Sequence, residues 1–290
     1  MTLRSEIDVL TPRSLDEALE LLHQKGDALK IVAGGSDVIV QLRDGLVKTD
    51  KLLNILSLSE LRYIRPIGSR IHIGALATYS DMIHNNLVKR HAWILSEAAR
   101  QIGAIQLQNT ATIGGNLGNA SPAGDSLPPL YALDAIVVTR SRAGRREIPI
   151  EQFFTGYRKT ALEPGELIEE VHFNGLESKD RGAYVKLGLR EANAISIVDV
   201  AVVLRGRNRD NSFTEARAAL GAVAPTIRRA HECEMALINK PLTSNVIHKA
   251  SLLAANDASP IDDIRGSAEY RKEAVASVVY QALHQAAMAR

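Results

Sequence analysis

The sequence predicts an α+β protein of two domains, from its length and from the order of its strand-like and helix-like segments. A chain of 290 residues is long enough to bury two hydrophobic cores. From residue 183 onward, three strand-like segments precede three helix-like ones, and this order indicates an antiparallel sheet rather than alternating βαβ units. We place the domain boundary in the polar segment 174–182, which gives domains at residues 1–176 and 177–290.

Composition and charge argue against several classes of function. The chain carries 35 Lys and Arg against 33 Asp and Glu, and a net charge of +2 gives no field that would hold nucleic acid or a membrane surface. Its single cysteine, Cys233, cannot form an intrachain disulfide, a four-cysteine zinc site or an iron–sulfur cluster. Residues 1–10 lack the pattern of a signal peptide, and no apolar run reaches 18 residues, so we expect a cytoplasmic protein without membrane insertion.

The first domain begins with a helix, a short strand and a glycine turn. Ser14 and Glu17 form a capping-box pattern, an apolar stripe follows, and Gly26 suits the end of the helix. A β-prone run at residues 29–33 then stops at Gly34-Gly35 and passes into a helical segment at residues 38–42. We therefore expect strand, glycine turn and helix in succession.

Hairpins and helices fill the rest of the first domain. Pro122 and Gly124 exclude regular helix between residues 119 and 125. We expect a strand at 52–55, a hairpin at 63–67 and 70–74, helices at 81–87 and 92–102, a second glycine turn at 110–116, a hairpin at 135–139 and 146–150, and a closing strand at 166–173.

The second domain has a simpler order. Strands are expected at residues 183–189, 195–204 and 213–220, and helices at residues 230–238, 245–256 and 267–289. No internal repeat is present.

The two glycine turns are the strongest candidates for a binding site. A backbone without Cβ approaches a ligand closely and adopts positive φ, so that successive N–H groups converge on an anion. Each turn is followed by a polar side chain, Ser36 or Asn116. Neither turn fits the Rossmann or Walker pattern. Asp125, just beyond the second turn, suits either a ribose or ribityl hydroxyl or the cap of a helix at 126–133.

Other candidates are weaker. Residues 231–234 contain groups that bind metals, but consecutive helical residues point in different directions, so we expect no metal there. Ser121 lacks the nucleophile-elbow pattern of a hydrolase. The arginines at the tip of the second hairpin form either a solvated tip or a docking patch; they are Arg140, Arg142, Arg145 and Arg146.

Three segments together resemble a known family. Residues 31–37, 111–116 and 120–125 are similar to the flavin-binding segments of the FAD subunit of molybdenum hydroxylases, which include bacterial xanthine dehydrogenase and aerobic carbon monoxide dehydrogenase. Residues 220–226 resemble a loop in the second domain of that subunit, so the similarity spans nearly the whole chain.

The resemblance implies an FAD-binding domain of the p-cresol methylhydroxylase type, followed by a small C-terminal domain with a three-stranded antiparallel sheet and a helical bundle. It places cofactor contacts in the first glycine segment at Ile31, Val32, Ala33, Gly34, Gly35, Ser36, Asp37 and Val38; in the second at Thr112, Ile113, Gly114, Gly115 and Asn116; and elsewhere at Ile102, Ser121, Asp125, Ile168, Lys186 and Ile195.

Two of these positions carry specific expectations. Carbon monoxide dehydrogenase has a Tyr over the flavin ring, whereas residues 190–196 here contain none and resemble the xanthine dehydrogenase form. The resemblance therefore implies that Ile195 packs on the ring, with Glu191 as an acidic neighbour. Lys186 corresponds to a Lys near the flavin edge, where its charge would favour reduction, so Lys186→Ala is expected to lower the flavin potential.

The resemblance also implies a function. The chain would be the FAD-containing electron-transfer subunit of a heteromeric oxidoreductase, with no catalytic side chain and no metal of its own. It would accept electrons from the [2Fe–2S] clusters of a small subunit, in an assembly with a large molybdenum-cofactor subunit, and pass them from FAD to an external acceptor. The expected assembly is a dimer of heterotrimers. A stand-alone flavin oxidoreductase and a cofactor-free scaffold are the alternatives.

Overall fold

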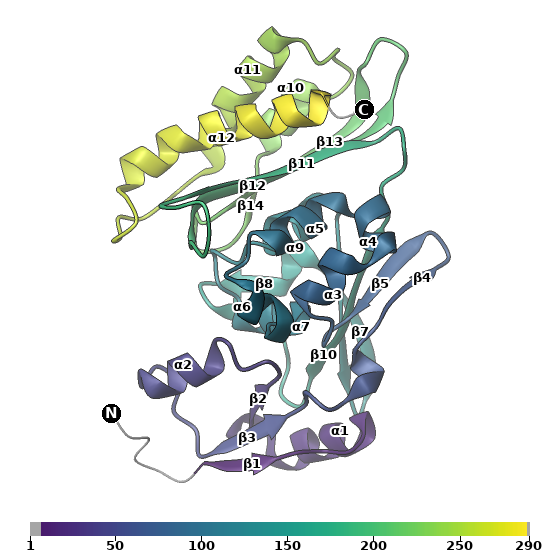
Figure 1. Ribbon diagram of the computed structural model, residues 1–290, viewed down its shortest axis with the longest axis vertical. Coiled ribbons are helices and arrows are strands. Elements are labelled where there is room, and N and C mark those ends of the chain that lie inside the picture. The colour runs from purple at the N-terminus through teal and green to yellow at the C-terminus, as the bar shows by residue number, and fades with distance from the viewer. Residues whose placement is uncertain (1–6, 289–290) are drawn as a thin grey trace.

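The computed structural model describes residues 7–288 and consists of three parts stacked along its long axis (Figure 1). A small parallel sheet near the N-terminus forms one end. A five-stranded sheet with short helices occupies the middle, and a four-stranded sheet covered by three helices forms the other end.

The end part is built on strands β1 (Asp8–Leu10), β2 (Lys30–Val32) and β3 (Lys51–Asn54), in the parallel order β1-β3-β2. Helix α1 (Leu15–Lys25) packs its apolar stripe on this sheet, and α2 (Val38–Arg43) follows the first glycine segment as predicted. The short 3₁₀ turns η1 (Gly26–Ala28) and η2 (Ser59–Leu61) complete the part.

The predicted capping box at the start of α1 is half formed. The Ser14 hydroxyl accepts a hydrogen bond from the Glu17 N–H at 3.2 Å. The Glu17 carboxylate accepts from the Arg13 N–H instead of that of Ser14. The second hydrogen bond of the capping box is therefore missing, because the Glu17 carboxylate bonds to the residue before Ser14.

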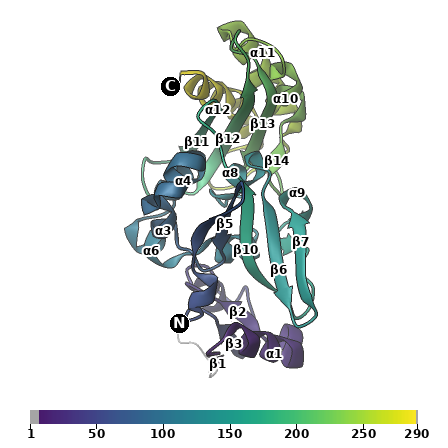
Figure 2. The ribbon, with the colours of Figure 1, turned by 90° about the vertical axis from the view of Figure 1, so that its right-hand side faces the viewer.

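The middle sheet is antiparallel, in the order β4-β5-β10-β6-β7 (Figure 2). Both predicted hairpins form, as β4/β5 and β6/β7. The segment expected as a closing strand is instead the central strand, because it pairs with one strand of each hairpin. The bounds are β4 Ile64–Ile67, β5 Arg70–Gly74, β6 Ile136–Ser141, β7 Gly144–Pro149 and β10 Leu167–Asn174.

Helices cover one face of this sheet and shield the apolar side chains of β5, β6 and β10. Asn85 divides the predicted helix 81–87 in two, because its extended backbone ends one helix while its side chain caps the next. The helices are α3 Tyr79–His84, α4 Asn86–His91, α5 Trp93–Arg100, α6 Ile105–Thr110, α7 Ile113–Asn119, α8 Leu127–Ala132 and α9 Ile150–Phe153; the small hairpin β8 (Phe154–Gly156) and β9 (Lys159–Thr160) follows.

The second glycine segment is not a turn, and that prediction is wrong. Gly114 and Gly115 lie in α7, which begins after Thr112 and ends at Ala120 in the left-handed conformation. A Cβ on Gly114 would lie 2.6 Å from the Cβ of Ala75, so this glycine allows the helix to pack against the chain that leaves β5.

The second large sheet has the order β11-β12-β13-β14 and is antiparallel. Its three long strands agree with the prediction, and a two-residue strand adds to the edge. The bounds are β11 Arg181–Gly188, β12 Ser196–Arg207, β13 Phe213–Gly221 and β14 Arg228–Arg229.

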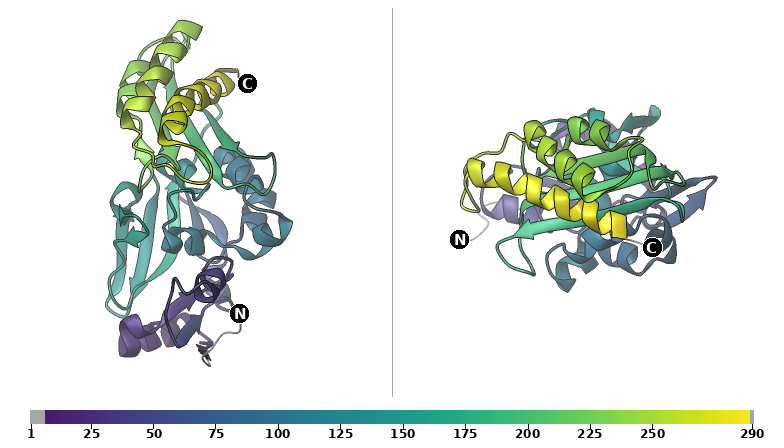
Figure 3. Two further views of the ribbon diagram at one scale, coloured as in Figure 1. Left: turned by 90° about the vertical axis from the view of Figure 1, so that its left-hand side faces the viewer. Right: turned by 90° about the horizontal axis from the view of Figure 1, so that it is seen from above.

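Helices α10 (His231–Leu237), α11 (Ser244–Ala254) and α12 (Ala268–Met288) cover the outer face of this sheet, and η3 (Ala255–Asp257) extends α11 (Figure 3). Val200 and Val202 of β12 point to these helices, whereas Ala201 and Val203 join the core of the middle part. The second sheet therefore has two buried faces. None of the helices within residues 7–288 combines the length and apolar character that crossing a membrane requires.

Candidate functional site

The two glycine segments lie in direct contact. A Cβ on Gly34 would be 1.8 Å from the carbonyl oxygen of Thr110, so only glycine permits this approach. The two segments line one cavity of about 720 Å³, within the size range of small-molecule and cofactor pockets. The expectation that both segments serve one site therefore agrees with the structure.

Most of the predicted positions line this cavity. They are residues 31–38 of the first segment; Thr112, Gly114, Gly115 and Asn116 of the second; and Ile102, Asp125 and Ile168. Four predicted positions lie outside the lining: Ile113, Ser121, Lys186 and Ile195. Their contact with a cofactor stays a prediction.

Each of these four residues has a clear local environment. Ile113 is fully buried in the core of the middle part. The Ser121 hydroxyl accepts a hydrogen bond from the Ala123 N–H within the turn after α7. Lys186 extends from β11 to Asp125 at the cavity wall. Ile195 is 63% exposed on the loop between β11 and β12.

Three successive backbone N–H groups of the first segment are free donors. Among residues 7–288, no hydrogen-bond acceptor is recorded for the N–H groups of Gly34, Gly35 and Ser36. Gly35 has a φ of +73°, which favours glycine, and a Cβ there would meet Val32 and Ile39. These N–H groups precede α2 in residues that line the cavity, so they are candidate donors to an anion there.

In the second segment, the N–H groups of residues 113–116 are bonded within the chain, so this segment contributes mainly shape. The N–H groups of Ile113 and Gly114 bond to the carbonyl oxygens of Ala77 and Ala75. Those of Gly115 and Asn116 bond to the side chain and carbonyl of Thr112.

Two glycines of α7 keep the cavity open. A Cβ on Gly115 would meet only the Thr112 hydroxyl, at 3.0 Å, and one on Gly118 would meet only the side chain of Ile168, at 3.7 Å. Both residues line the cavity. Side chains at these positions would therefore extend into the space that a bound molecule needs. The residues present fit a dinucleotide, because glycine leaves this part of the cavity open.

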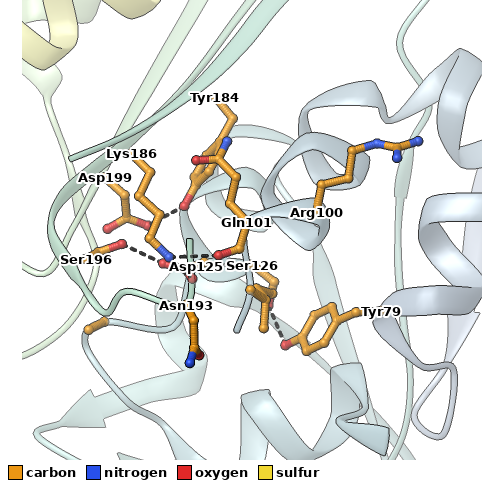
Figure 4. Close-up of polar contacts among 12 residues, drawn as sticks. Tyr79, Arg100, Gln101, Asp125, Ser126, Tyr184, Lys186, Asn193, Ser196 and Asp199 are labelled. Carbon is orange, nitrogen blue, oxygen red and sulfur yellow. Dashed lines mark hydrogen bonds and ion pairs between the residues drawn. The ribbon is translucent and has the colours of Figure 1, made fainter. Parts of the chain in front are cut away.

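Asp125, which lines the cavity, forms a buried ion pair with Lys186 behind it (Figure 4). The Lys186 ammonium lies 2.6 Å from Asp125 Oδ2 and also donates to the Gln101 carbonyl at 3.0 Å. The Ser196 hydroxyl donates to Asp125 Oδ1 at 2.6 Å. Burial raises the pKa of Asp125, and Lys186 opposes that shift. Helix α8 begins after Ser126 without a side-chain cap, so the alternative role of Asp125 as its cap is wrong.

Gln41 and Asn119 also line the cavity, although the sequence patterns did not single them out. Gln41 donates to Asn119 Oδ1 at 2.7 Å, and Arg158 donates to the same oxygen at 3.2 Å. Burial raises the pKa of the nearby Asp37 carboxyl, whereas the charge of Arg158 lowers it. Gln41 lies one helical turn after Asp37, so helical spacing from the first segment offered a signal for it.

The arginines at the β6–β7 hairpin pair with acids of neighbouring elements. Arg142 lies 2.8 Å from Glu20, and Arg146 lies 2.7 Å from Glu166. Arg145 lies 3.0 Å from Glu169. The hairpin tip is thus neutralised within the chain. Across residues 7–288, no group of three or more His, Cys, Asp or Glu is arranged to hold a metal ion.

Comparison with known proteins decides the family. Residues 5–173 match the family described as the FAD binding domain in molybdopterin dehydrogenase, and residues 183–286 match the CO dehydrogenase flavoprotein C-terminal domain. The chain is an FAD-binding medium subunit of the molybdenum hydroxylase family. The resemblance seen in the sequence is confirmed, and FAD is the cofactor of this medium subunit.

Relatives match the medium subunit over nearly its whole length. It is 32% identical to the nicotinate dehydrogenase FAD-subunit of Eubacterium barkeri, covering 94% of this chain and 93% of that one. It is 33% identical to the carbon monoxide dehydrogenase medium chain of Hydrogenophaga pseudoflava, covering 95% of each.

A solved structure confirms the fold. In the carbon monoxide dehydrogenase from Hydrogenophaga pseudoflava that lacks the Mo-pyranopterin moiety, one chain superposes on the medium subunit with a TM-score of 0.93. The two are 32% identical and cover 97% of each other. The predicted fold class is therefore confirmed, and the medium subunit is part of an oxidoreductase.

Proposed function

We propose that the medium subunit is the electron-transfer flavoprotein of a heteromeric molybdenum hydroxylase. It would accept electrons from [2Fe–2S] clusters of a partner subunit and pass them from FAD to an external acceptor. The observation that carries this proposal is the single cavity lined by both glycine segments in a chain of this family. The Asp125 carboxylate at its wall is committed to Lys186 and Ser196, which supports electron transfer over proton abstraction from a substrate.

The N–H groups of Gly34, Gly35 and Ser36 would hold the cofactor diphosphate, because they are donors without an acceptor in residues that line the cavity. Gly115 and Gly118 would leave room for the molecule. When bound, FAD supplies the redox chemistry, and the protein sets its position and its electrostatic surroundings.

Side chains at the wall would contact the rest of the cofactor. Ile102 and Ile168 line the cavity and offer apolar surface to it. Lys186 and Asp125 would lie near the ring edge as a nearly neutral pair. Ile195, on its exposed loop, would pack on the ring.

The domain boundary and the partners belong to the same proposal. Domains at residues 1–176 and 177–290 are supported by the two family matches, which end at residue 173 and begin at residue 183. A smaller and a larger partner chain are supported by relatives named medium chains. That these partners carry the [2Fe–2S] clusters and the molybdenum cofactor, in a dimer of heterotrimers, is part of the proposal. A cytoplasmic location is supported by the single, unpaired Cys233.

Copurification from the native host tests this function. The tagged chain should bring down two partner chains, with flavin, iron and molybdenum in fixed proportion. Flavin without iron or molybdenum, together with direct reduction by a small molecule, would favour a stand-alone flavin oxidoreductase. Absence of flavin absorbance after reconstitution with FAD would favour a cofactor-free scaffold.

A further inference from the structure

A second buried carboxylate, Asp199, lies beside Lys186 and Tyr184 (Figure 4). It sits on β12 opposite Lys186 of β11 and Gly221 of β13, and it is fully buried. Its Oδ2 accepts a hydrogen bond from the Tyr184 hydroxyl at 3.1 Å. Its Oδ1 has no hydrogen-bond partner among residues 7–288.

Asp199 Oδ1 lies against the backbone of Gly221 rather than against a cation. A Cβ on Gly221 would lie 2.2 Å from Asp199 Oδ1 and 2.8 Å from Pro128 Cγ. The position of the Asp199 carboxyl therefore depends on glycine at the end of β13. The apolar ring of Pro128 lies beside the same space and offers no donor to the free oxygen.

The buried cluster has two carboxyls and one ammonium. Lys186 is bonded to Asp125, which also receives the Ser196 hydroxyl. Burial and repulsion from Asp125 raise the pKa of Asp199 well above its ordinary value, and Lys186 only partly opposes this. An unpaired buried carboxylate is strongly unfavourable, and such a group normally takes up a proton.

We propose that Asp199 is a positioning residue of the cofactor site: a neutral, protonated acid that acts through Tyr184 to keep Asp125 ionised against Lys186. Protonation of Asp199 reverses the contact seen across 3.1 Å, so that its carboxyl donates to the Tyr184 oxygen. The Tyr184 hydroxyl proton is then free for Asp125, whose pKa Tyr184 helps to lower. This orientation makes Tyr184 a third donor to Asp125, beside Lys186 and Ser196.

The chain of hydrogen bonds links the second sheet to the cavity. Tyr184, Lys186 and Asp199 lie on the face of that sheet that points to the middle part, and Asp125 is the member that lines the cavity. A protonated Asp199 leaves the cluster with one anion and one cation, so its net charge is zero. Its importance for FAD rests on the proposed function, but its protonation is a property of the chain alone.

Infrared spectroscopy of the cofactor-free full chain tests the protonation directly. The wild type should show the carbonyl stretching band of a buried carboxylic acid at neutral pH, and Asp199→Asn should remove it. Tyr184→Phe should keep the band and shift it to higher frequency, because the acid loses its acceptor. Asp180→Asn is the matched control, since Asp180 is equally buried but has Arg205 as its cation at 3.5 Å, and it should leave the band unchanged.

The pH dependence of unfolding is a second measurement on the same chain. The folded state keeps the Asp199 proton, whereas the unfolded state releases it above about pH 4, so the wild type loses stability as the pH rises. Between about pH 5 and 8, the unfolding constant of the wild type should rise relative to that of Asp199→Asn, by up to about tenfold per pH unit for as long as the folded state keeps the proton.

Two results would overturn the proposal: an acid band that survives in Asp199→Asn, or a ratio of unfolding constants that stays flat across this pH range. Both measurements are made without cofactor. A failure of FAD binding or of electron transfer would therefore leave them unaffected, and the two proposals fail separately.

Discussion

The ammonium of Lys186 lies 2.6 Å from Oδ2 of Asp125, and this pair joins the second large sheet to the segment before α8. Both side chains are at least nine-tenths buried. The cation that the sequence places near the flavin edge is therefore already balanced by an anion. The effect of the Lys186 charge on the potential of a bound cofactor therefore depends on whether Asp125 is ionised.

The first prediction concerns this balance. Lys186→Gln should lower the midpoint potential of bound FAD by the equivalent of about 1–2 kcal/mol, because Asp125 loses its balancing charge at low effective dielectric. The double variant Lys186→Gln, Asp125→Asn should recover most of this loss. Redox titration of the holoprotein measures both variants. Equal potentials in the wild type and Lys186→Gln would show that the pair does not act on the ring.

The second prediction separates packing from binding among the glycines. Gly34→Ala should destabilise the fold and release FAD, because the methyl group would collide with the Thr110 carbonyl. Gly118→Ala is the matched change in a glycine that faces the cavity, and it should weaken FAD binding while the melting temperature of the cofactor-free chain stays near that of the wild type. A Gly34→Ala protein as stable as the wild type would contradict the close contact.

The glycine segments also show how far the sequence predicts this site. Residue types pointed to the two glycine segments, since both are rich in glycine and follow apolar runs, and the family resemblance supplied most of the other lining positions. They did not distinguish a glycine that faces the ligand from one that faces protein. Gly35→Val, for example, would place a side chain at the cavity and would also strain a backbone with a φ of +73°. That distinction depends on which tertiary neighbour each missing Cβ would meet.

A similar limit applies to the fold. The strands and helices of the second sheet follow from local pattern, because their apolar periodicity is long and regular. Asn85, by contrast, splits one expected helix, since a single capping side chain outweighs a continuous apolar stripe. The pairing of Asp125 with Lys186 joins residues far apart in sequence, so local pattern contains no signal for it.

The third prediction concerns a salt-bridge cluster at the start of α12. Arg271 is 2% exposed and pairs with Asp263, which also binds Arg265; Arg265 donates to the Ser196 carbonyl at 3.1 Å. Asp263→Asn should cost about 3 kcal/mol of unfolding free energy, because it leaves the buried Arg271 charge unpaired. Chemical denaturation measures this, with the exposed Asp210→Asn as a control. A loss below about 1 kcal/mol would contradict the role of the cluster.

The fourth prediction concerns acid stability. His172 of β10 is buried and stacks on His72 with ring centroids 4.7 Å apart. Burial and the neighbouring His72 lower the pKa of His172, so the folded state binds fewer protons than the unfolded state below about pH 6.5. Stability contributed by the neutral ring is therefore lost as the pH falls.

His172→Leu should reduce this loss. Thermal unfolding between about pH 7.5 and 5 should show a shallower decline in melting temperature for the variant than for the wild type. His84→Leu, a change at an exposed position, serves as the comparison. If the melting temperatures of the wild type and His172→Leu decline in parallel as the pH falls, a group other than His172 causes the loss of stability.

The most direct test of the central claim is the flavin content of Gly115→Val, measured from the visible spectrum of the purified medium subunit. A Cβ at this position meets only the Thr112 hydroxyl and otherwise faces the cavity. The account predicts a folded chain, shown by an unchanged circular dichroism spectrum, that retains little or no FAD. Stoichiometric FAD in this variant would contradict the placement of the cofactor between the two glycine segments.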